Sequence, residues 1–363
     1  MMKIPVRRFW IPGKVQLNGS KGGTYMNYLK WLSQTDGYWW TDTADYATLD
    51  EAIENGATGV TANPILIKKS LYANPAFWRP YLDSAVGLQG DAKAEEILRC
   101  ITVEIAKKFQ PIYEQTNGIQ GFVCAQVNPK KQGDTAAMVE MGRRLAGWAP
   151  NIAVKLPGTA AGLRAIEELA AEGITTVGIV SFTTPQAVAI AAAQQRGLDR
   201  CKAAGRKPGM AFSVLMVGRL DDYLRDVAKD MQADVPESDI ICAGTAAIKK
   251  AYQICKKRGY EAKLMPAGMR GGYHAVALAG ADMSFSLSAG ILTTLLKETE
   301  YKEHIDEAVS AETLAKLNTI EEFVRAYNVE ELREEEFIRY GASQRTLSQF
   351  VEAGWNMIAE FSL

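Results

Sequence analysis

The sequence predicts an α/β fold and, within that class, a (β/α)₈ barrel, also called a TIM barrel. Eight short apolar runs are present, and nearly all are followed by a helical pattern. Together these strand and helix units span about 260 of the 363 residues. The runs are continuous rather than alternating, as expected for strands covered on both faces. No G-x-G-x-x-G follows the first run, which counts against an open doubly wound sheet.

Each expected strand is a β-branched or otherwise apolar run that ends near Gly, Pro or Asn. These runs lie at 38–45, 57–64, 119–129, 151–157, 174–182, 209–218, 260–268 and 281–288. Helical patterns follow at 46–56, from 65 to about 116, and at 134–147, 160–173 and 185–204. Gly56 and Gly173 stand where two of these helices end.

We expect one barrel domain over residues 1–363, with extra helices at both ends. An N-terminal extension covers about residues 1–25, and a helical segment covers about 300–363. The C-terminal segment is acidic in "VEELREEEF" and aromatic in "QFVEAGWNMIAEF". A helix packed over the barrel explains this pattern, and a contact between subunits of a homo-oligomer is a second interpretation.

Composition excludes several classes of partner. The net charge is -1, so no overall field favours nucleic acid or an acidic membrane surface. No apolar stretch approaches the roughly 20 residues of a membrane span, and the first residues lack a signal-peptide core. We therefore expect a cytoplasmic protein.

Cysteine and histidine usage argues against a disulfide framework or a metal site. The five cysteines form no C-x-x-C, and the two histidines, His274 and His304, are far apart in sequence.

The run "NIAVKLPGTAAG" (151–162) places Lys155 at the end of an apolar strand. A buried ammonium group is costly unless it is paired. Either Lys155 extends to water at the strand end, or its neutral amine is used in a reaction.

The carboxyl ends of the expected strands carry a set of polar residues. In a (β/α)₈ barrel these ends form the active site. The residues are Asp42, Asn63, Gln126, Lys155, Ser181, Thr183, Arg219 and Arg270. So many polar residues converging on one rim, with a lysine among them, predict a reaction site.

The residue types point to carbonyl chemistry. A desolvated Lys155 amine can attack a ketone to give a Schiff base, which draws electrons from the adjacent carbon–carbon bond. Asp42 can move the proton of the hydroxyl whose ionisation breaks that bond. Two arginines can hold a phosphate bidentately, and Asn63 can hydrogen-bond substrate hydroxyls.

Structural roles are the alternative for several of these residues. A purely structural ion-pair network would explain the charges. Asn63 could instead shape the turn before Pro64, Arg219 could pair with Asp221 or Asp222, and Gln126 could satisfy backbone groups inside the barrel.

Five segments, in order, resemble the transaldolase family, which includes a fructose-6-phosphate aldolase branch. They are "TDTAD" (41–45), "GVTANPILI" (59–67), "VKLPGTAAGLRAIEELAAEGI" (154–174), "VGRLDD" (217–222) and "YEAKLMPAGMR…ALAGAD" (260–282). The resemblance implies a barrel that moves or releases a dihydroxyacetone unit through a lysine Schiff base, without metal or organic cofactor. It also implies a sugar phosphate as partner and a place in carbohydrate metabolism, as in the pentose phosphate pathway.

The resemblance assigns roles residue by residue. Lys155 matches the Schiff-base lysine and Asp42 the catalytic aspartate. Four other residues match substrate-binding positions, namely Thr61 and Asn63 in the "T-x-N-P" turn and Arg219 and Arg270 at the phosphate.

This chain departs from the family pattern at its proton relay. Gln126 stands where transaldolases carry a glutamate, and glutamine can hold a catalytic water but cannot take its proton. Ile179 and Val177 stand at the places of a threonine and an asparagine, and Val214 and Gly268 at those of two serines. The aldolase branch also reads "AQV" around Gln126, but the tyrosine of that branch falls on Met216.

Three hypotheses follow. The first is transaldolase-type transfer of a dihydroxyacetone unit between sugar phosphates. The second, favoured by Gln126, is aldolase-type cleavage of a ketose phosphate. The third is a catalytically weak barrel that binds a sugar phosphate, favoured by Ile179 and Val214. Those two residues also indicate a substrate other than the common pentose-phosphate pair.

Overall fold

The computed structural model describes residues 26–362, so the expected extension over about 1–25 lies outside the described residues. All eight expected strands are present. They are β1 (Tyr38–Thr41), β2 (Ala57–Val60), β3 (Phe122–Gln126), β4 (Ile152–Pro157), β5 (Thr176–Ile179), β6 (Ala211–Leu215), β7 (Lys263–Pro266) and β8 (Ser284–Leu287). Each is shorter than its apolar run, because the ends of the runs form turns.

The strands form one parallel sheet in the order β7-β6-β5-β4-β3-β2-β1-β8. A bridge between Leu264 and Met283 joins the two edge strands, so the sheet curls into a nearly closed barrel. The predicted (β/α)₈ barrel is confirmed.

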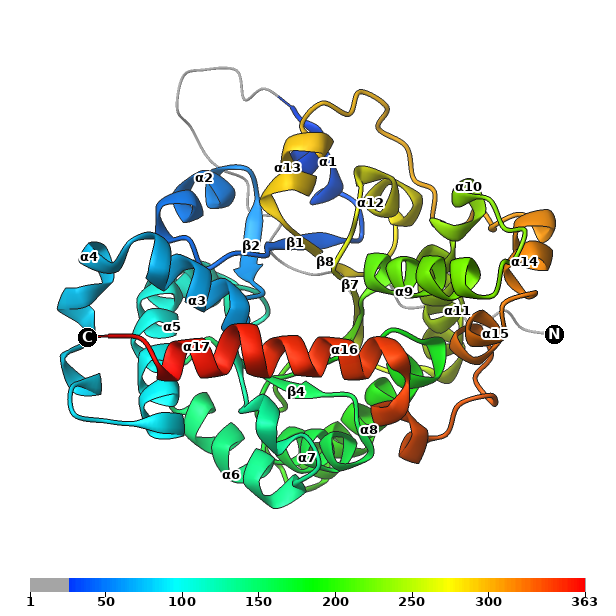
Figure 1. Cartoon of the computed structure of the whole chain (residues 1–363). Helices are drawn as coiled ribbons and strands as arrows, with labels where there is room; N and C mark the ends of the chain where they lie inside the picture. Colours follow the sequence, from blue (N-terminus) through cyan, green and yellow to red (C-terminus); the bar gives the residue numbers. More distant parts are fainter. Residues whose placement is uncertain (1–25, 363) are drawn as a thin grey trace.

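Helices surround the barrel (Figure 1). Those between the strands are α2 (Leu49–Glu54), α3 (Pro64–Ala73), α4 (Pro75–Trp78), α5 (Gly90–Gln115), α6 (Thr135–Ala146), α7 (Ala160–Ala171), α8 (Thr184–Ala203), α9 (Val217–Asp230), α10 (Glu237–Ile240), α11 (Ala243–Arg258) and α12 (Gly272–Leu278). The expected helical region from 65 to about 116 is thus divided into several helices. Gly56 and Gly173 follow α2 and α7 with positive φ, as their positions at helix ends predict.

Extra helices flank the repeating units, as predicted. They are α1 (Tyr28–Leu32) before β1, and α13 (Ala289–Leu295), α14 (Ala311–Leu317), α15 (Glu321–Tyr327), α16 (Gly341–Phe350), the π-helical turn η6 (Val351–Trp355) and α17 (Asn356–Ala359) after β8. In Figure 1, α16 and α17 form one rod that runs across the view in front of the strands.

The aromatic tail packs onto its own chain. Phe350 and Trp355 are buried, and the Trp355 indole donates a hydrogen bond of 2.9 Å to Asp91 Oδ1 at the start of α5. At Gly354, a side chain would come within 2.9 Å of Pro64 Cβ, so glycine permits η6 to approach α3. These contacts explain the apolar pattern of the tail within a single chain.

Three aromatic rings fill the inside of the barrel. Trp40 on β1, Phe122 on β3 and Phe212 on β6 are buried, with ring centroids 4.8–6.2 Å apart. Because these strands are not neighbours in the sheet, the rings meet across the inside of the barrel. Gly59 on β2 makes room for them, since a Cβ there would lie 2.7 Å from the Trp40 ring and from the Phe122 carbonyl oxygen.

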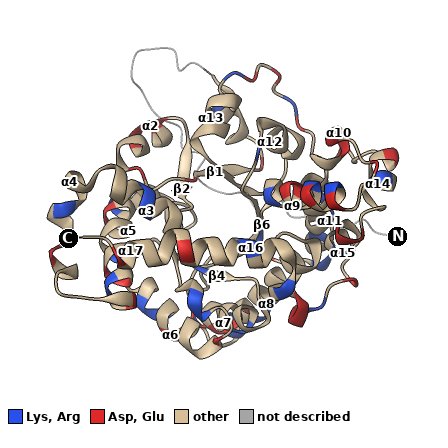
Figure 2. Cartoon of the chain, in the orientation of Figure 1, with Lys and Arg blue, Asp and Glu red and all other residues tan. Residues whose placement is uncertain are grey.

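The outer helices carry both signs of charge. Figure 2 shows basic and acidic residues interspersed on α7, α8 and α9, and many pair, such as Arg143 with Glu172 and Arg200 with Glu168. Within residues 26–362 no helix is long and apolar enough to cross a membrane.

The Gly59 contact yields a stability prediction. Gly59→Ala should lower the free energy of unfolding by about 1–3 kcal/mol, because the added methyl group overpacks the aromatic cluster. Urea denaturation measures the change. Gly133→Ala is the control, since no atom lies within 4 Å of its added Cβ. Equal stability of the two variants would contradict the packing described here.

Candidate active site

A cavity of about 150 Å³ lies at the carboxyl ends of the strands. It brings together six of the nine residues that the sequence analysis singled out. These are Asp42, Thr61, Asn63, Lys155, Arg219 and Arg270. Because they follow or end five different strands, the fold itself assembles the group.

Lys155 is buried at the cavity, with 6% of its surface exposed. It sits on β4 in register with Gln126 on β3. Its Nζ donates a hydrogen bond of 3.1 Å to the carbonyl oxygen of Ala62, and it forms no ion pair with any carboxylate among the described residues. Lys155 therefore does not extend to bulk water, and its amine group faces the space where a ligand would bind.

Asp42 is the carboxylate of the cavity. Thr61 Oγ1 donates to Asp42 Oδ1 at 2.9 Å and contacts Ser286 Oγ at 2.6 Å. A threonine hydroxyl has one proton, so Ser286 is the donor to Thr61 when Thr61 donates to Asp42. Burial raises the pKa of Asp42, and Lys155, Thr61 and Arg219 partly oppose that rise.

Asn63 caps a helix and also lines the cavity. Its Oδ1 accepts hydrogen bonds from the backbone N–H groups of Ile65 (2.9 Å) and Leu66 (3.1 Å), which caps α3 ahead of Pro64. Its Nδ2 forms no hydrogen bond with any residue in 26–362. Since Asn63 also lines the cavity, this group is free to donate to a ligand.

Two arginines lie at the rim. Arg219, in the first turn of α9, donates to Thr346 Oγ1 at 3.1 Å and to Gln349 Oε1 at 2.7 Å, both on α16. Arg270 pairs with Asp222 Oδ2 through two nitrogens, at 2.6 and 2.7 Å. The expected alternative of Arg219 pairing with Asp221 or Asp222 is therefore wrong, because α16 supplies its partners.

The two guanidinium groups influence each other. Burial and the charge of Arg270 lower the pKa of Arg219, and Asp222 and Asp42 oppose that shift. Arginine stays protonated in proteins, so the rim holds two nearby positive charges. An anion bound between them would relieve their repulsion.

A buried pair beneath the rim holds the two arginine-bearing turns together. His274 Nε2 lies 2.8 Å from Asp221 Oδ2, and both side chains are fully buried. Asp221 also accepts from the Gly244 backbone at 2.8 Å, and the Arg270 backbone N–H faces His274 Nδ1 at 3.5 Å. Sequence analysis missed this pair. The only available signal was the "RLDD" spacing, which places Asp221 two residues after Arg219.

Three predicted rim residues do not line the cavity. Gln126 is buried beside Lys155, and its Oε1 has no partner among the described residues, so no bond to the backbone supports its alternative role. Ser181 is buried and its hydroxyl is likewise unpartnered within 26–362. Thr183 caps α8 by accepting from the Gln186 backbone at 3.1 Å.

In the described part of the chain, no group of three His, Cys, Asp or Glu residues comes together that could hold a metal ion. His304 lies at the surface and contacts Glu307. The five cysteines are free thiols.

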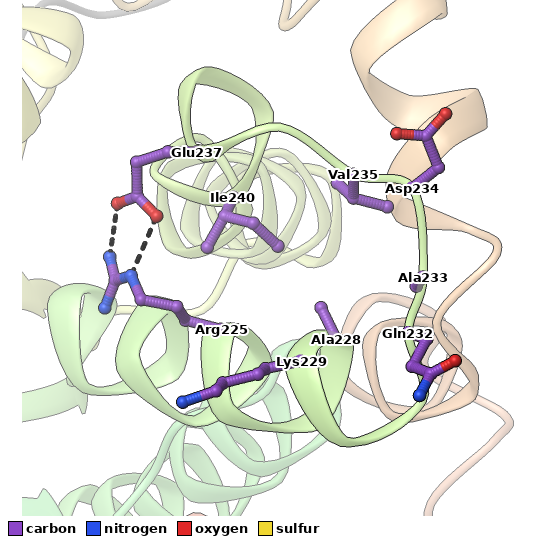
Figure 3. Close-up of a pocket in the computed structure, with 9 residues that line it drawn as sticks. All are labelled: Arg225, Ala228, Lys229, Gln232, Ala233, Asp234, Val235, Glu237 and Ile240. Atoms are coloured by element: carbon purple, nitrogen blue, oxygen red, sulfur yellow. Dashed lines mark hydrogen bonds and ion pairs between the residues drawn. The ribbon is translucent and has the colours of Figure 1, made fainter.

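A second, open depression of about 390 Å³ lies outside the barrel, between α9 and α10 (Figure 3). Arg225 forms two hydrogen bonds with Glu237 across it, at 2.8 and 2.6 Å. Figure 3 shows that the side chains of Arg225 and Glu237 point toward each other and not into the depression. This depression contains none of the predicted site residues, so the cavity at the strand ends is the candidate active site.

Comparison with known proteins identifies one family. A family model described as Transaldolase/Fructose-6-phosphate aldolase matches residues 39–350. A transaldolase from Thiobacillus denitrificans is 28% identical over 309 residues, which cover 80% of this chain and 81% of the relative. Transaldolase 1 from Streptomyces avermitilis is 30% identical over 267 residues, 70% of this chain and 66% of the relative. A transaldolase from Thermobifida fusca is 31% identical over 207 residues, 54% of each chain.

The contact between Thr61 and Asp42 yields a prediction about proton affinity. Thr61→Val should raise the pKa of Asp42 further, because it removes a donor that stabilises the ionised carboxylate. A carbon-13 NMR titration of the Asp42 carboxyl measures the change. Thr102→Val is the matched control, since Thr102 is a buried threonine on α5 whose hydroxyl has no partner among the described residues. A lower pKa in Thr61→Val would refute the bond.

Proposed function

We propose, on the premise that this chain belongs to the Transaldolase/Fructose-6-phosphate aldolase family, that it transfers a dihydroxyacetone unit between sugar phosphates. The observation that carries the proposal is the shared cavity, which places the buried amine of Lys155 near Asp42 and below two arginines. A barrel that only binds a sugar phosphate has no need of a buried amine there.

The reaction begins at Lys155. Its neutral amine attacks the C2 carbonyl of a ketose phosphate, and loss of water gives a protonated Schiff base. The carbonyl oxygen of Ala62, 3.1 Å from Nζ, orients the nitrogen toward the cavity.

Asp42 carries the proton that controls bond cleavage. As a base it takes the proton of the C4 hydroxyl, the C3–C4 bond breaks, and the electron pair moves to the Schiff-base nitrogen as an enamine forms. An aldose phosphate leaves. The raised pKa of Asp42 suits this exchange, because a general base works best when its pKa is nearer the working pH.

Arg219 and Arg270 bind the phosphate at the rim. Their present partners are neutral side chains of α16 for Arg219 and Asp222 for Arg270. A phosphate dianion offers stronger, bidentate hydrogen bonds than the amide of Gln349. With the phosphate at the rim, the sugar chain extends into the cavity toward Lys155.

Aldolase-type release is the second candidate, and Gln126 favours it. Its buried Oε1 lies on the strand next to Lys155 and cannot take a proton from a catalytic water. In a transfer, the enamine attacks an acceptor aldehyde. In a cleavage, the enamine is protonated and dihydroxyacetone is released.

The need for an acceptor separates these activities. Incubation with fructose 6-phosphate alone should give little product if the chain is a transferase, and addition of erythrose 4-phosphate should start turnover. Product formation at the same rate without acceptor would identify an aldolase.

Schiff-base formation yields a direct prediction. Incubation with fructose 6-phosphate followed by borohydride should leave a reduced adduct on Lys155, detected by mass spectrometry of peptides, and Lys155→Met should abolish it. Lys249 is an internal control, because it is also buried but donates to the backbone oxygens of His304 and Glu307 away from the cavity. An adduct on Lys249, or none on Lys155, would defeat both enzyme proposals.

The phosphate role of the arginines yields a second prediction. In a Lys155→Met background, which prevents reaction, Arg219→Ala combined with Arg270→Ala should weaken fructose 6-phosphate binding about 100-fold, since each removes a charged hydrogen-bonding group. Isothermal titration calorimetry measures this. The matched control is Arg196→Ala with Arg200→Ala, two arginines paired with Glu167 and Glu168 outside the barrel. Unchanged affinity in the rim variant would remove the phosphate role.

A further inference from the structure

The buried pair of Asp221 and His274 lies between the two turns that carry the rim arginines. Asp221 is on α9, two residues after Arg219. His274 is on α12, four residues after Arg270. The two side chains are fully buried, with His274 Nε2 2.8 Å from Asp221 Oδ2. Neither residue lines the cavity, so a role of the pair in function acts through the arginines.

The contacts of the pair determine which ring nitrogen of His274 carries the proton. The Arg270 backbone N–H faces His274 Nδ1 at 3.5 Å, and a backbone N–H can only donate. Nδ1 is therefore the acceptor, and Nε2–H donates a hydrogen bond to Asp221. The other oxygen of Asp221, Oδ1, accepts from the Gly244 backbone N–H at 2.8 Å at the start of α11. The imidazole thus connects α9 with the turn that precedes α12.

The two arginine-bearing turns also touch each other directly. Gly218 immediately precedes Arg219, and a Cβ added at Gly218 would lie 2.5 Å from the Gly268 carbonyl oxygen. The same Cβ would lie 2.8 Å from Arg270 Cγ and 2.9 Å from the Arg270 backbone nitrogen. Because the packing here leaves no free space, a displacement of one turn moves the other.

The arginine side chains have anchors that differ in kind from the link through His274. Arg270 pairs with the carboxylate of Asp222. Arg219 donates to the amide oxygen of Gln349. A phosphate at the rim competes with these partners for the guanidinium groups. His274 contacts the backbone of Arg270 instead, so its link persists while the guanidinium groups change partners.

We propose that His274 is a positioning residue for phosphate binding, because it links the Arg270 backbone to Asp221 and so sets the spacing of the two arginine-bearing turns. The inference rests on the proposed function, in which Arg219 and Arg270 bind the substrate phosphate. Bidentate binding of a phosphate by two arginines requires a defined spacing, and a small displacement weakens it. A ketone without a phosphate reaches Lys155 without using this link.

Two substitutions each keep one half of the link. His274→Gln can place an amide N–H near the position of Nε2, which keeps a donor to Asp221 but leaves no acceptor at Nδ1. His274→Asn can place its amide oxygen near the position of Nδ1, which keeps an acceptor for the Arg270 N–H but leaves Asp221 Oδ2 without its donor. Each variant therefore breaks the link at a different end.

Both variants should weaken fructose 6-phosphate binding about tenfold, measured by calorimetry in a Lys155→Met background. His304→Gln is the matched control, since His304 lies at the surface and contacts Glu307, and it should bind as the unchanged chain does. Normal affinity in either His274 variant would overturn the proposal, because the link would then not set the spacing of the arginines.

A substrate without a phosphate separates positioning from general damage to the fold. With Lys155 present, borohydride trapping of dihydroxyacetone on Lys155 should fall far less in the two His274 variants than the affinity for fructose 6-phosphate. An equal loss of both would show that His274 only stabilises the barrel, and the proposal would be wrong. No adduct in the unchanged chain with either ketone would instead defeat the proposed function.

Nitrogen-15 NMR tests the link with His274 in place. The spectrum should show the His274 proton on Nε2 and none on Nδ1. In the Lys155→Met chain, fructose 6-phosphate should shift the Nδ1 signal of His274, because binding acts on Arg270, and leave His304 unchanged. A proton on Nδ1, or no shift while calorimetry shows binding, would overturn the proposal even if both His274 variants fail to fold.

Discussion

The rings of Trp40, Phe122 and Phe212 meet across the inside of the barrel, and the depth of the cavity depends on this packing. Inward positions alternate along a strand, so the next inward residue after Trp40 is Asp42, and after Phe212 it is Val214. The buried rings fill the barrel beneath these residues, and the rim lies above. The side chains that line the cavity therefore stand one layer above an apolar cluster, where burial makes charge costly and strengthens hydrogen bonds.

The residues that line the cavity fall into a buried group and a group nearer solvent. Lys155 and Asp42 share one desolvated space, and each is held by a single neutral group, the Ala62 carbonyl and the Thr61 hydroxyl respectively. The two arginines stand nearer solvent, where positive charge costs less. The buried pair of Asp221 and His274 lies outside the cavity and connects the turns that carry these arginines, so the arginines and the Lys155–Asp42 region are held by separate contacts.

Local patterns explain what the sequence predicted well. The apolar runs located all eight strands, and the rule that barrel sites form at strand ends selected Asp42, Asn63 and Lys155 before any contact was known. A local role for Asn63 at the turn before Pro64 was also foreseen, and the structure shows the form that it takes, a cap on α3. Long-range contacts were not foreseen. The partners of Arg219 lie about 130 residues away on α16, and nothing in "VGRLDD" encodes them. The same limit applies to Ile179, Val214 and Met265, because their position side by side at the cavity appears only once the strand register is known.

The place of α16, η6 and α17 after all eight strands affects when the cavity is completed during synthesis. Chains emerge from the ribosome amino end first, and earlier segments fold before later ones. A nascent chain that has emerged only as far as α15 contains every strand of the barrel and both Lys155 and Asp42, but it lacks the Gln349 bond to Arg219 and the Phe350 side of the cavity. For that interval the cavity is open on the side that α16 later covers. These later helices therefore complete the pocket around Lys155.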